Sequence, residues 1–155
     1  MSLQRELKLP QPFQNKKHEA LLNILRTASL LSKRGDSFFS KYEVTMAQFN
    51  LLMVLKYSGL AHLTQSEIAE RLLVNRANIT GLIDRLEKTG LVERMPDKKD
   101  RRHYFITFTS KGRKTVDQIE QAYDKEVNLL MRDISDAEAS EVIRVMEKLR
   151  EPDAL

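Results

Sequence analysis

The sequence contains no cysteine, no tryptophan, and only five glycines and four prolines in 155 residues. Without cysteine, disulfides, thiolate metal sites, cysteine nucleophiles and thiol redox sensing are all excluded. The scarcity of glycine and proline argues against a disordered or loop-built chain, and a hydrophobic content of 41% is enough to bury a core. We therefore expect one globular, mainly α domain over residues 1–155.

Long apolar runs and catalytic signatures are also missing. The longest apolar run, Leu51–Leu55, is far shorter than the ~20 residues of a membrane span, and no apolar stretch follows the charges at the N-terminus, so a cytoplasmic location is expected. His18, His62 and His103 lack the spacing of metal ligands. With no glycine-rich phosphate loop and no paired nucleophile and base, we expect no metal, no cofactor and no enzyme activity.

The charges are unevenly distributed along the chain. Residues 1–63 carry 9 basic and 4 acidic side chains, residues 64–114 carry 12 and 7, and residues 115–155 carry 5 and 11. The formal net charge of +4 therefore combines a basic body with an acidic C-terminal segment. A nucleic-acid surface or ordinary solvated helix faces would both account for the basic excess.

Apolar residues spaced by three and four predict helices over 14–40, 45–58, 65–72 and 75–89, and two more within 110–150. Capping boxes mark three helix starts, at Thr45, Thr64 and Ser135, and Gly59 and Gly90 suit helix ends. Between these helices, the β-branched and aromatic stretches 91–94 and 104–108 predict an antiparallel hairpin whose charged tip spans residues 95–103.

A short helix, a turn, a second helix and a hairpin form the layout of a winged helix-turn-helix, here over residues 45–112. At 100° per residue, Ile79, Leu82, Ile83 and Leu86 share one face of the second helix. The opposite face consists of side chains able to read base edges and of small residues that allow a close approach, together with one carboxylate: Ala77, Asn78, Thr80, Gly81, Asp84, Arg85 and Lys88. A solvated helix face is the alternative, and Asp84 argues against a surface that faces only phosphates.

The hairpin tip is rich in cations. Its basic residues suit a narrow minor groove, where the negative potential is focused, and Asp100 is placed to orient a guanidinium before DNA arrives. A charged loop is solvated by default, so the hairpin tip indicates DNA binding only together with the neighbouring helix 75–89, here called the reading helix, whose exposed face can read base edges.

Four segments resemble the MarR (multiple antibiotic resistance regulator) family: 63–69 (LTQSEIA), 79–94 (ITGLIDRLEKTGLVER), 97–102 (DKKDRR) and 106–112 (ITFTSKG). The wing motif of the family is similar to D-x-R-D-x-R. Lys99 occupies the position of the first arginine of this motif, so we assign the wing contact with DNA to Arg102 more than to Lys99. Taken together, the residues and the resemblance assign DNA contacts to Thr64, Gln65, Ser66, Asn75, Arg76, Ala77, Asn78, Thr80, Gly81, Arg85, Lys98, Lys99, Arg101 and Arg102.

The resemblance implies a mainly α fold with a small β-hairpin wing, and a homodimer built from helices in 14–40 and 110–150. It also implies binding to pseudo-palindromic double-stranded DNA, repression or sometimes activation of nearby genes, and release by a small aromatic or phenolic anion. The apolar stripes on these helices support the dimer independently, since the short remaining elements cannot cover them. Phe38, Tyr42, Phe49 and Met53 are candidates for lining an effector pocket, although such residues at helical spacing also form plain core.

Two alternatives remain at this point. A winged-helix module used for protein contacts would keep the fold and make the reading face incidental. A protein that coats DNA without regard to sequence would need only the basic charge, and the mixed Asn, Thr, Gly and Arg face argues against it.

Overall fold

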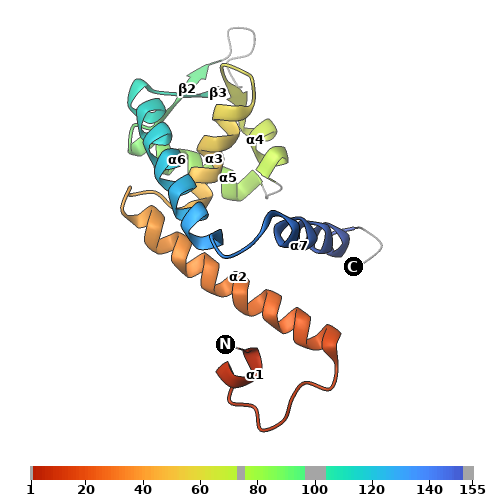
Figure 1. Ribbon diagram of the computed structural model, residues 1–155. Coiled ribbons are helices and arrows are strands. Elements are labelled where there is room, and N and C mark those ends of the chain that lie inside the picture. The colour runs from red at the N-terminus through yellow and green to blue at the C-terminus, as the bar shows by residue number, and fades with distance from the viewer. Residues whose placement is uncertain (1, 73–75, 97–103, 152–155) are drawn as a thin grey trace. The chain divides into compact units, whose positions relative to one another are not determined.

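The computed structural model describes residues 2–72, 76–96 and 104–151, with Arg76 and Ala77 described by their backbone alone (Figure 1). These residues form seven α-helices and three β-strands: α1 (Leu3–Glu6), α2 (Lys16–Ser40), α3 (Met46–Tyr57), β1 (Leu63–Thr64), α4 (Gln65–Leu72), α5 (Arg76–Lys88), β2 (Val92–Pro96), β3 (Tyr104–Phe108), α6 (Ser110–Met131) and α7 (Asp136–Leu149). The chain divides into two compact units, Met1–Gly112 and Arg113–Leu155, and each is described by itself. The predicted mainly α fold with a small β wing is confirmed.

The core of the first unit lies among the C-terminal end of α2, the helices α3, α4 and α5, and the sheet. Its members are apolar side chains that the helical and strand periodicities turn inward, and the fully buried ones include Phe39, Leu51, Leu52, Leu63, Ile68, Ile79, Ile83, Leu86, Val92 and Ile106. The predicted capping box of α3 is present, with the Gln48 N–H donating to Thr45 Oγ1 over 3.2 Å and the Thr45 N–H donating to Gln48 Oε1 over 2.8 Å. The bond from the Thr45 N–H also gives the side-chain oxygen of Gln48, a buried polar residue of this core, a hydrogen-bond partner.

The sheet has three antiparallel strands in the order β1-β3-β2. Leu63 of β1 pairs with Ile106, and β2 pairs with β3 from Val92 opposite Phe108 to Pro96 opposite Tyr104. The third strand, β1, was not predicted because two residues carry too little pattern to identify a strand. Since β2 is an edge strand, Pro96 removes no N–H that a neighbouring strand would need.

The end of α5 and the start of α6 meet at the base of the hairpin. Gly90, with φ +71°, ends α5 in a Schellman motif in which the Leu91 N–H donates to the Leu86 carbonyl over 2.9 Å. Thr109 donates its hydroxyl to the Gly90 carbonyl over 2.6 Å and its N–H to the Leu91 carbonyl over 3.2 Å. The Gly112 N–H then donates to Thr109 Oγ1 over 2.9 Å, so Thr109 caps α6. The two ends of the hairpin are thus fastened to each other.

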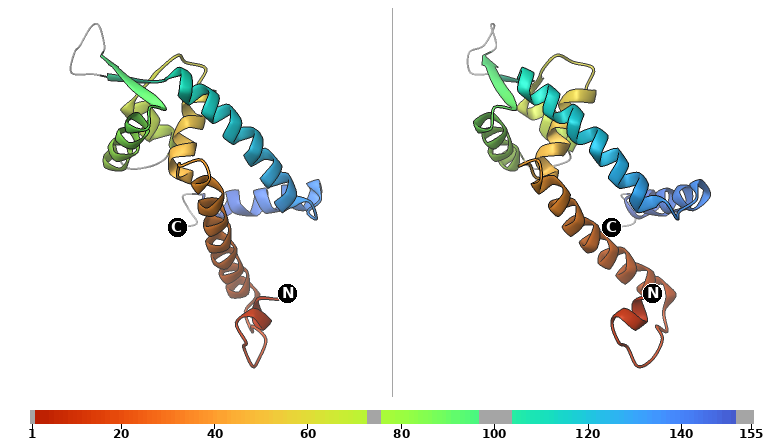
Figure 2. Two further views of the ribbon diagram at one scale, coloured as in Figure 1. Left: turned by 90° about the vertical axis from the view of Figure 1, so that its left-hand side faces the viewer. Right: turned by 60° about the vertical axis from the view of Figure 1, so that its left-hand side comes forward.

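Helix α2 is a single helix of 25 residues that begins at the Asn15 cap, where the side-chain oxygen accepts from the Lys17 and His18 N–H groups. In both views of Figure 2, only its C-terminal end lies beside α3, and its buried residues, Gly35, Phe38 and Phe39, are all at that end. Much of its remaining apolar surface is exposed.

In the second unit, α6 continues to Met131 and α7 follows the predicted capping box of Ser135 and Glu138. No residue of α7 is buried, and apolar side chains such as Leu129, Val142 and Ile143 are more than half exposed. None of the helices in the described ranges is long and apolar enough to cross a membrane.

Candidate nucleic-acid interface

The predicted division of α5 into two faces is present in the structure. Ile79, Ile83 and Leu86 are fully buried, whereas Asn78, Thr80, Asp84, Arg85 and Lys88 are exposed and Gly81 is half-buried. This exposed face therefore presents an amide, a hydroxyl and cations side by side, which is the chemistry needed to read base edges and hold phosphates. The Ala77 side chain, also assigned to this face, lies outside the description.

The first turn of α4 lies against this face. Gln65 donates from Nε2 to Thr80 Oγ1 over 2.5 Å, which joins a predicted DNA-contacting residue of α4 to one of α5. Thr64 is engaged differently, because its N–H and its hydroxyl both donate to Glu67 Oε2 over 2.7 Å. Ser66 is exposed at the same helix start. Thr64, Gln65 and Ser66 thus lie at the end of α4 that borders the exposed face of α5.

Arg85 is the cation near the middle of the exposed face. Its Nε donates to the Gly81 carbonyl over 2.9 Å, so the guanidinium lies along its own helix rather than extending into solvent. A Cβ added at Gly81 would meet only Arg85 Nη2, at 3.4 Å. Gly81 itself has no side chain that projects from this part of the helix. A DNA base or phosphate can therefore approach the α5 backbone closely here.

Several predicted contacts lie outside the described residues. They comprise Asn75 before α5 and the wing-tip residues Lys98, Lys99, Asp100, Arg101 and Arg102, and the side chain of Arg76 is likewise not described. These assignments remain predictions.

An ion-pair cluster joins the wing to the reading helix, and the sequence analysis missed it. Arg94 of β2 donates from its two terminal guanidinium nitrogens to Asp84 and to Glu87 of α5, and its backbone N–H donates to Glu87 Oε1 over 3.3 Å. Burial by itself lowers the pKa of Arg94, but the hydrogen bond to Asp84 and the charge of Glu87 outweigh it and raise the pKa above its ordinary value. The Arg94 guanidinium is therefore a permanent cation between two carboxylates.

The candidate effector residues are distributed between core and surface. Phe38 and Phe49 are buried and pack against Phe39, with ring centroids 5.1 and 4.8 Å away, so these two rings belong to the hydrophobic core. Tyr42 is half-buried beside Phe38. Of the four candidates, only Met53 lines an open hollow of about 450 Å³ in the described part of this unit.

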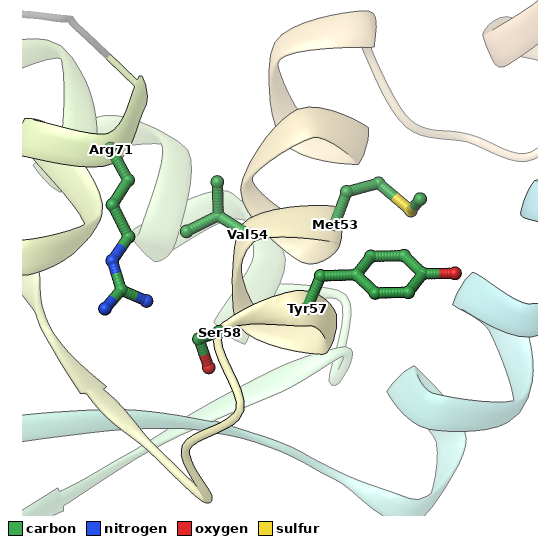
Figure 3. Close-up of a pocket in the computed structure, with 5 residues that line it drawn as sticks. All are labelled: Met53, Val54, Tyr57, Ser58 and Arg71. Carbon is green, nitrogen blue, oxygen red and sulfur yellow. The ribbon is translucent and has the colours of Figure 1, made fainter.

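The hollow lies against the C-terminal end of α3 and is bordered by Arg71 of α4. Figure 3 shows Met53 and Tyr57 projecting to one side of α3, while Val54 and Ser58 face the side where Arg71 of α4 lies. The lining is mostly apolar with one guanidinium. In the described parts of the chain, no group of three or more His, Asp or Glu side chains could hold a metal ion.

Comparison with known proteins identifies relatives for this arrangement. The MarR family model matches residues 44–104. The HTH-type transcriptional regulator PecS of Dickeya dadantii is 31% identical over 107 residues, which cover 68% of this chain and 64% of PecS. This chain therefore spans slightly less than two thirds of the length of that relative.

Solved structures match over most of the chain. AbsC, a MarR family transcriptional regulator from Streptomyces coelicolor, superposes with a TM-score of 0.81 at 20% identity, covering 91% of this chain and 96% of AbsC. A mutant MarR from E. coli in complex with operator DNA superposes with a TM-score of 0.70 at 22% identity, covering 88% of this chain and 99% of that one. At these identities the superpositions establish a shared fold.

Proposed function

Residues 44–104 of this chain belong to the MarR family, and from this premise we propose that the protein is a sequence-specific DNA-binding transcription regulator that acts in the cytoplasm as a homodimer. The observation that carries the proposal is the exposed face of α5, where Asn78, Thr80, Gly81 and Arg85 lie opposite a fully buried apolar face. The mixture of amide, hydroxyl and guanidinium groups supports base reading, because a surface that only held phosphates would need little more than lysine and arginine. The same face supports a role as a regulator rather than as an enzyme.

The dimer is supported by apolar surface that the described chain leaves exposed. On α2, Leu21 and Leu25 are 51% and 57% exposed, and Val142 and Ile143 of α7 are 53% and 56% exposed. Apolar stripes on several long helices are typical of an interface between copies of a chain. The acidic balance of residues 115–155 agrees with this assignment, since an acidic segment repels phosphate and belongs away from DNA.

A twofold dimer presents two copies of α5 to two DNA half-sites. We propose that these half-sites form a pseudo-palindrome with centres about one helical turn, roughly 10 base pairs, apart. Occupying such an operator represses the adjacent gene, and a small aromatic or anionic effector releases the protein. These parts of the proposal rest on the family resemblance.

Selection of bound sequences from a random pool of double-stranded DNA tests the proposal most directly. The expected result is one symmetric motif, bound with an affinity that falls steeply as salt rises because several phosphates are neutralised. Equal affinity for all sequences would instead indicate a protein that coats DNA, and absence of binding would favour a protein-contact module.

Two substitutions test the reading face itself. Asn78→Ala and Arg85→Ala are each expected to change the preferred base at one position of each half-site, at a cost of about 1–3 kcal/mol for a direct base contact. Asn23→Ala is the matched control, because Asn23 is an exposed asparagine on α2 whose amide donates to the Glu19 carbonyl over 2.9 Å. An unchanged selected motif for both α5 variants would reject their assignment to base reading.

A further inference from the structure

Arg94 connects two elements that a DNA-binding winged helix must hold at a fixed angle. Its guanidinium reaches across from β2 to Asp84 and Glu87, which lie three residues apart and therefore on the same side of α5. The Arg94 side chain is only 24% exposed, compared with 57% for Asp84 and 39% for Glu87. The arginine is thus partly withdrawn from water and engages two partners, which distinguishes it from an isolated surface ion pair.

Glu87 is bonded to Arg94 twice. One carboxylate oxygen accepts from the guanidinium and the other accepts from the Arg94 backbone N–H over 3.3 Å. Because β2 is an edge strand, the outward N–H groups of this strand have no neighbouring strand to bond. The carboxylate of Glu87 therefore fixes both the side chain and the main chain of β2 to the last turns of α5.

The same cluster determines the charge beside the reading face. Asp84 follows Gly81 by one helical turn and adjoins Arg85, so its carboxylate borders the surface proposed to meet DNA. An unpaired carboxylate there would repel phosphate. Arg94 can therefore act in two ways that an experiment can distinguish. It can neutralise the carboxylates of Asp84 and Glu87, or it can hold the wing in place.

We infer that Arg94 is a positioning residue for DNA binding, which fixes the angle between the β2–β3 wing and the reading helix by clamping Asp84 and Glu87. This inference rests on the proposed DNA-binding function. It requires no contact between Arg94 and DNA. The wing and α5 then engage adjacent grooves of the DNA as one rigid body. Without the clamp, α5 still binds its half-site, but the wing no longer contacts the DNA backbone that flanks it.

The decisive experiment removes the carboxylates and keeps the arginine. Asp84→Ala/Glu87→Ala adds two units of positive charge to the protein, so an explanation by charge cancellation requires tighter binding to DNA. The positioning role requires weaker binding, by about tenfold or more, measured by fluorescence anisotropy on the selected operator. Since alanine is a good helix former, α5 is retained, and circular dichroism verifies this.

Arg94→Ala and Arg94→Lys complete the design. For Arg94→Ala the slope of log affinity against log salt is expected to shrink by more than the value of about 0.9 that one phosphate contact contributes. Hydroxyl-radical footprints are expected to lose protection at the operator flanks while protection at the centre of each half-site remains. A lysine cannot engage both carboxylates as a planar fork does, so Arg94→Lys is expected to restore only part of the affinity.

Arg144→Ala is the matched control, since it removes the same charge from an ion pair with Glu141 on α7. Adding Asp84→Ala/Glu87→Ala to Arg94→Ala is expected to cause no further loss of DNA affinity, because Arg94→Ala already breaks the same contacts. Tighter binding by Asp84→Ala/Glu87→Ala, or wild-type flank protection in Arg94→Ala, overturns the inference while the DNA-binding function stands. If the wild-type protein selects no sequence, the proposed function itself fails.

Discussion

Gly112 is a glycine at which an added methyl group would collide with the main chain. A Cβ built at this position would lie 1.8 Å from the carbonyl oxygen of Leu91, 2.7 Å from its carbonyl carbon and 3.0 Å from its Cα. All three are backbone atoms, so no side chain can rotate away to make room. Gly112→Ala therefore requires the first turn of α6 to move away from the base of the hairpin.

The expected cost follows from two opposing effects. Replacing a helical glycine with alanine normally stabilises by up to about 1 kcal/mol. Relieving the contact requires a separation of more than about 1 Å, as real Cβ contacts essentially never come under 3.0 Å. That movement strains the Thr109 N–H bond to the Leu91 carbonyl, at 3.2 Å, and the Thr109 cap of the Gly112 N–H, at 2.9 Å. With overpacking at ~1–3 kcal/mol and two bonds weakened at ~1 kcal/mol each, less the gain of up to about 1 kcal/mol from alanine, we expect a net loss of about 2–4 kcal/mol.

Urea unfolding at a fixed protein concentration measures this loss, because an associating protein has a concentration-dependent stability. Gly81→Ala is the matched control: it makes the same change within a helix, but its new Cβ meets only the end of the Arg85 side chain at 3.4 Å. Gly81→Ala is expected to leave stability unchanged or to raise it by up to about 1 kcal/mol. If Gly112→Ala were as stable as Gly81→Ala, the close approach of α6 to Leu91 would be refuted.

Three further predictions concern the rest of the chain. Ile83→Ala is expected to lower the free energy of unfolding by about 3 kcal/mol, since Ile83 is fully buried, and a loss below about 1 kcal/mol in urea unfolding would contradict this. Leu25→Glu on α2 is expected to convert a dimer of 18.0 kDa chains to monomers in light scattering, whereas Leu60→Glu, at a similar exposure of 52% outside the long helices, leaves the mass unchanged; a dimeric Leu25→Glu would exclude this face of α2 from the interface. Hydrogen bonds from the Thr64 backbone N–H and hydroxyl lower the pKa of Glu67 from its ordinary 4.5, so its stabilisation is present above pH 4.5 and is lost as the pH falls through the lowered folded-state pKa. Glu67→Gln is therefore expected to be about 1 kcal/mol less stable at pH 7 and to approach the wild type as the pH falls through the lowered folded-state pKa of Glu67, and a difference that stays constant as the solution is acidified would count against the capping role.

The reading helix shows how far local pattern determines this fold. Placing residues at 100° intervals is enough to predict that Ile79, Ile83 and Leu86 are buried opposite Asn78 and Arg85, because a helix fixes the relative direction of its own side chains. The capping boxes at Thr45, Thr64 and Ser135 were predictable for the same reason, since each involves residues only three apart.

Contacts between elements were beyond the reach of the sequence alone. Arg94 lies ten residues from Asp84, and nothing in their spacing indicates that a strand will bring them together. Likewise, aromatic residues at helical spacing did not distinguish Phe49, which is buried in the core, from Met53, which lines the hollow. Both outcomes depend on how helices and strands pack, which is decided by the whole core rather than by neighbours in the chain.

The closure at the base of the hairpin has a consequence for engineering. Because Thr109 donates hydrogen bonds to the carbonyls of both Gly90 and Leu91, the start of β2 and the end of β3 are held together without the segment between Pro96 and Tyr104. That segment is therefore a natural site for grafting: residues 97–103 can be exchanged for those of a relative while the supporting scaffold keeps its own bonds. Since the wing tip is predicted to contact DNA, we expect chimaeras of this kind to transfer a preference for flanking DNA between regulators without changing the exposed face of α5.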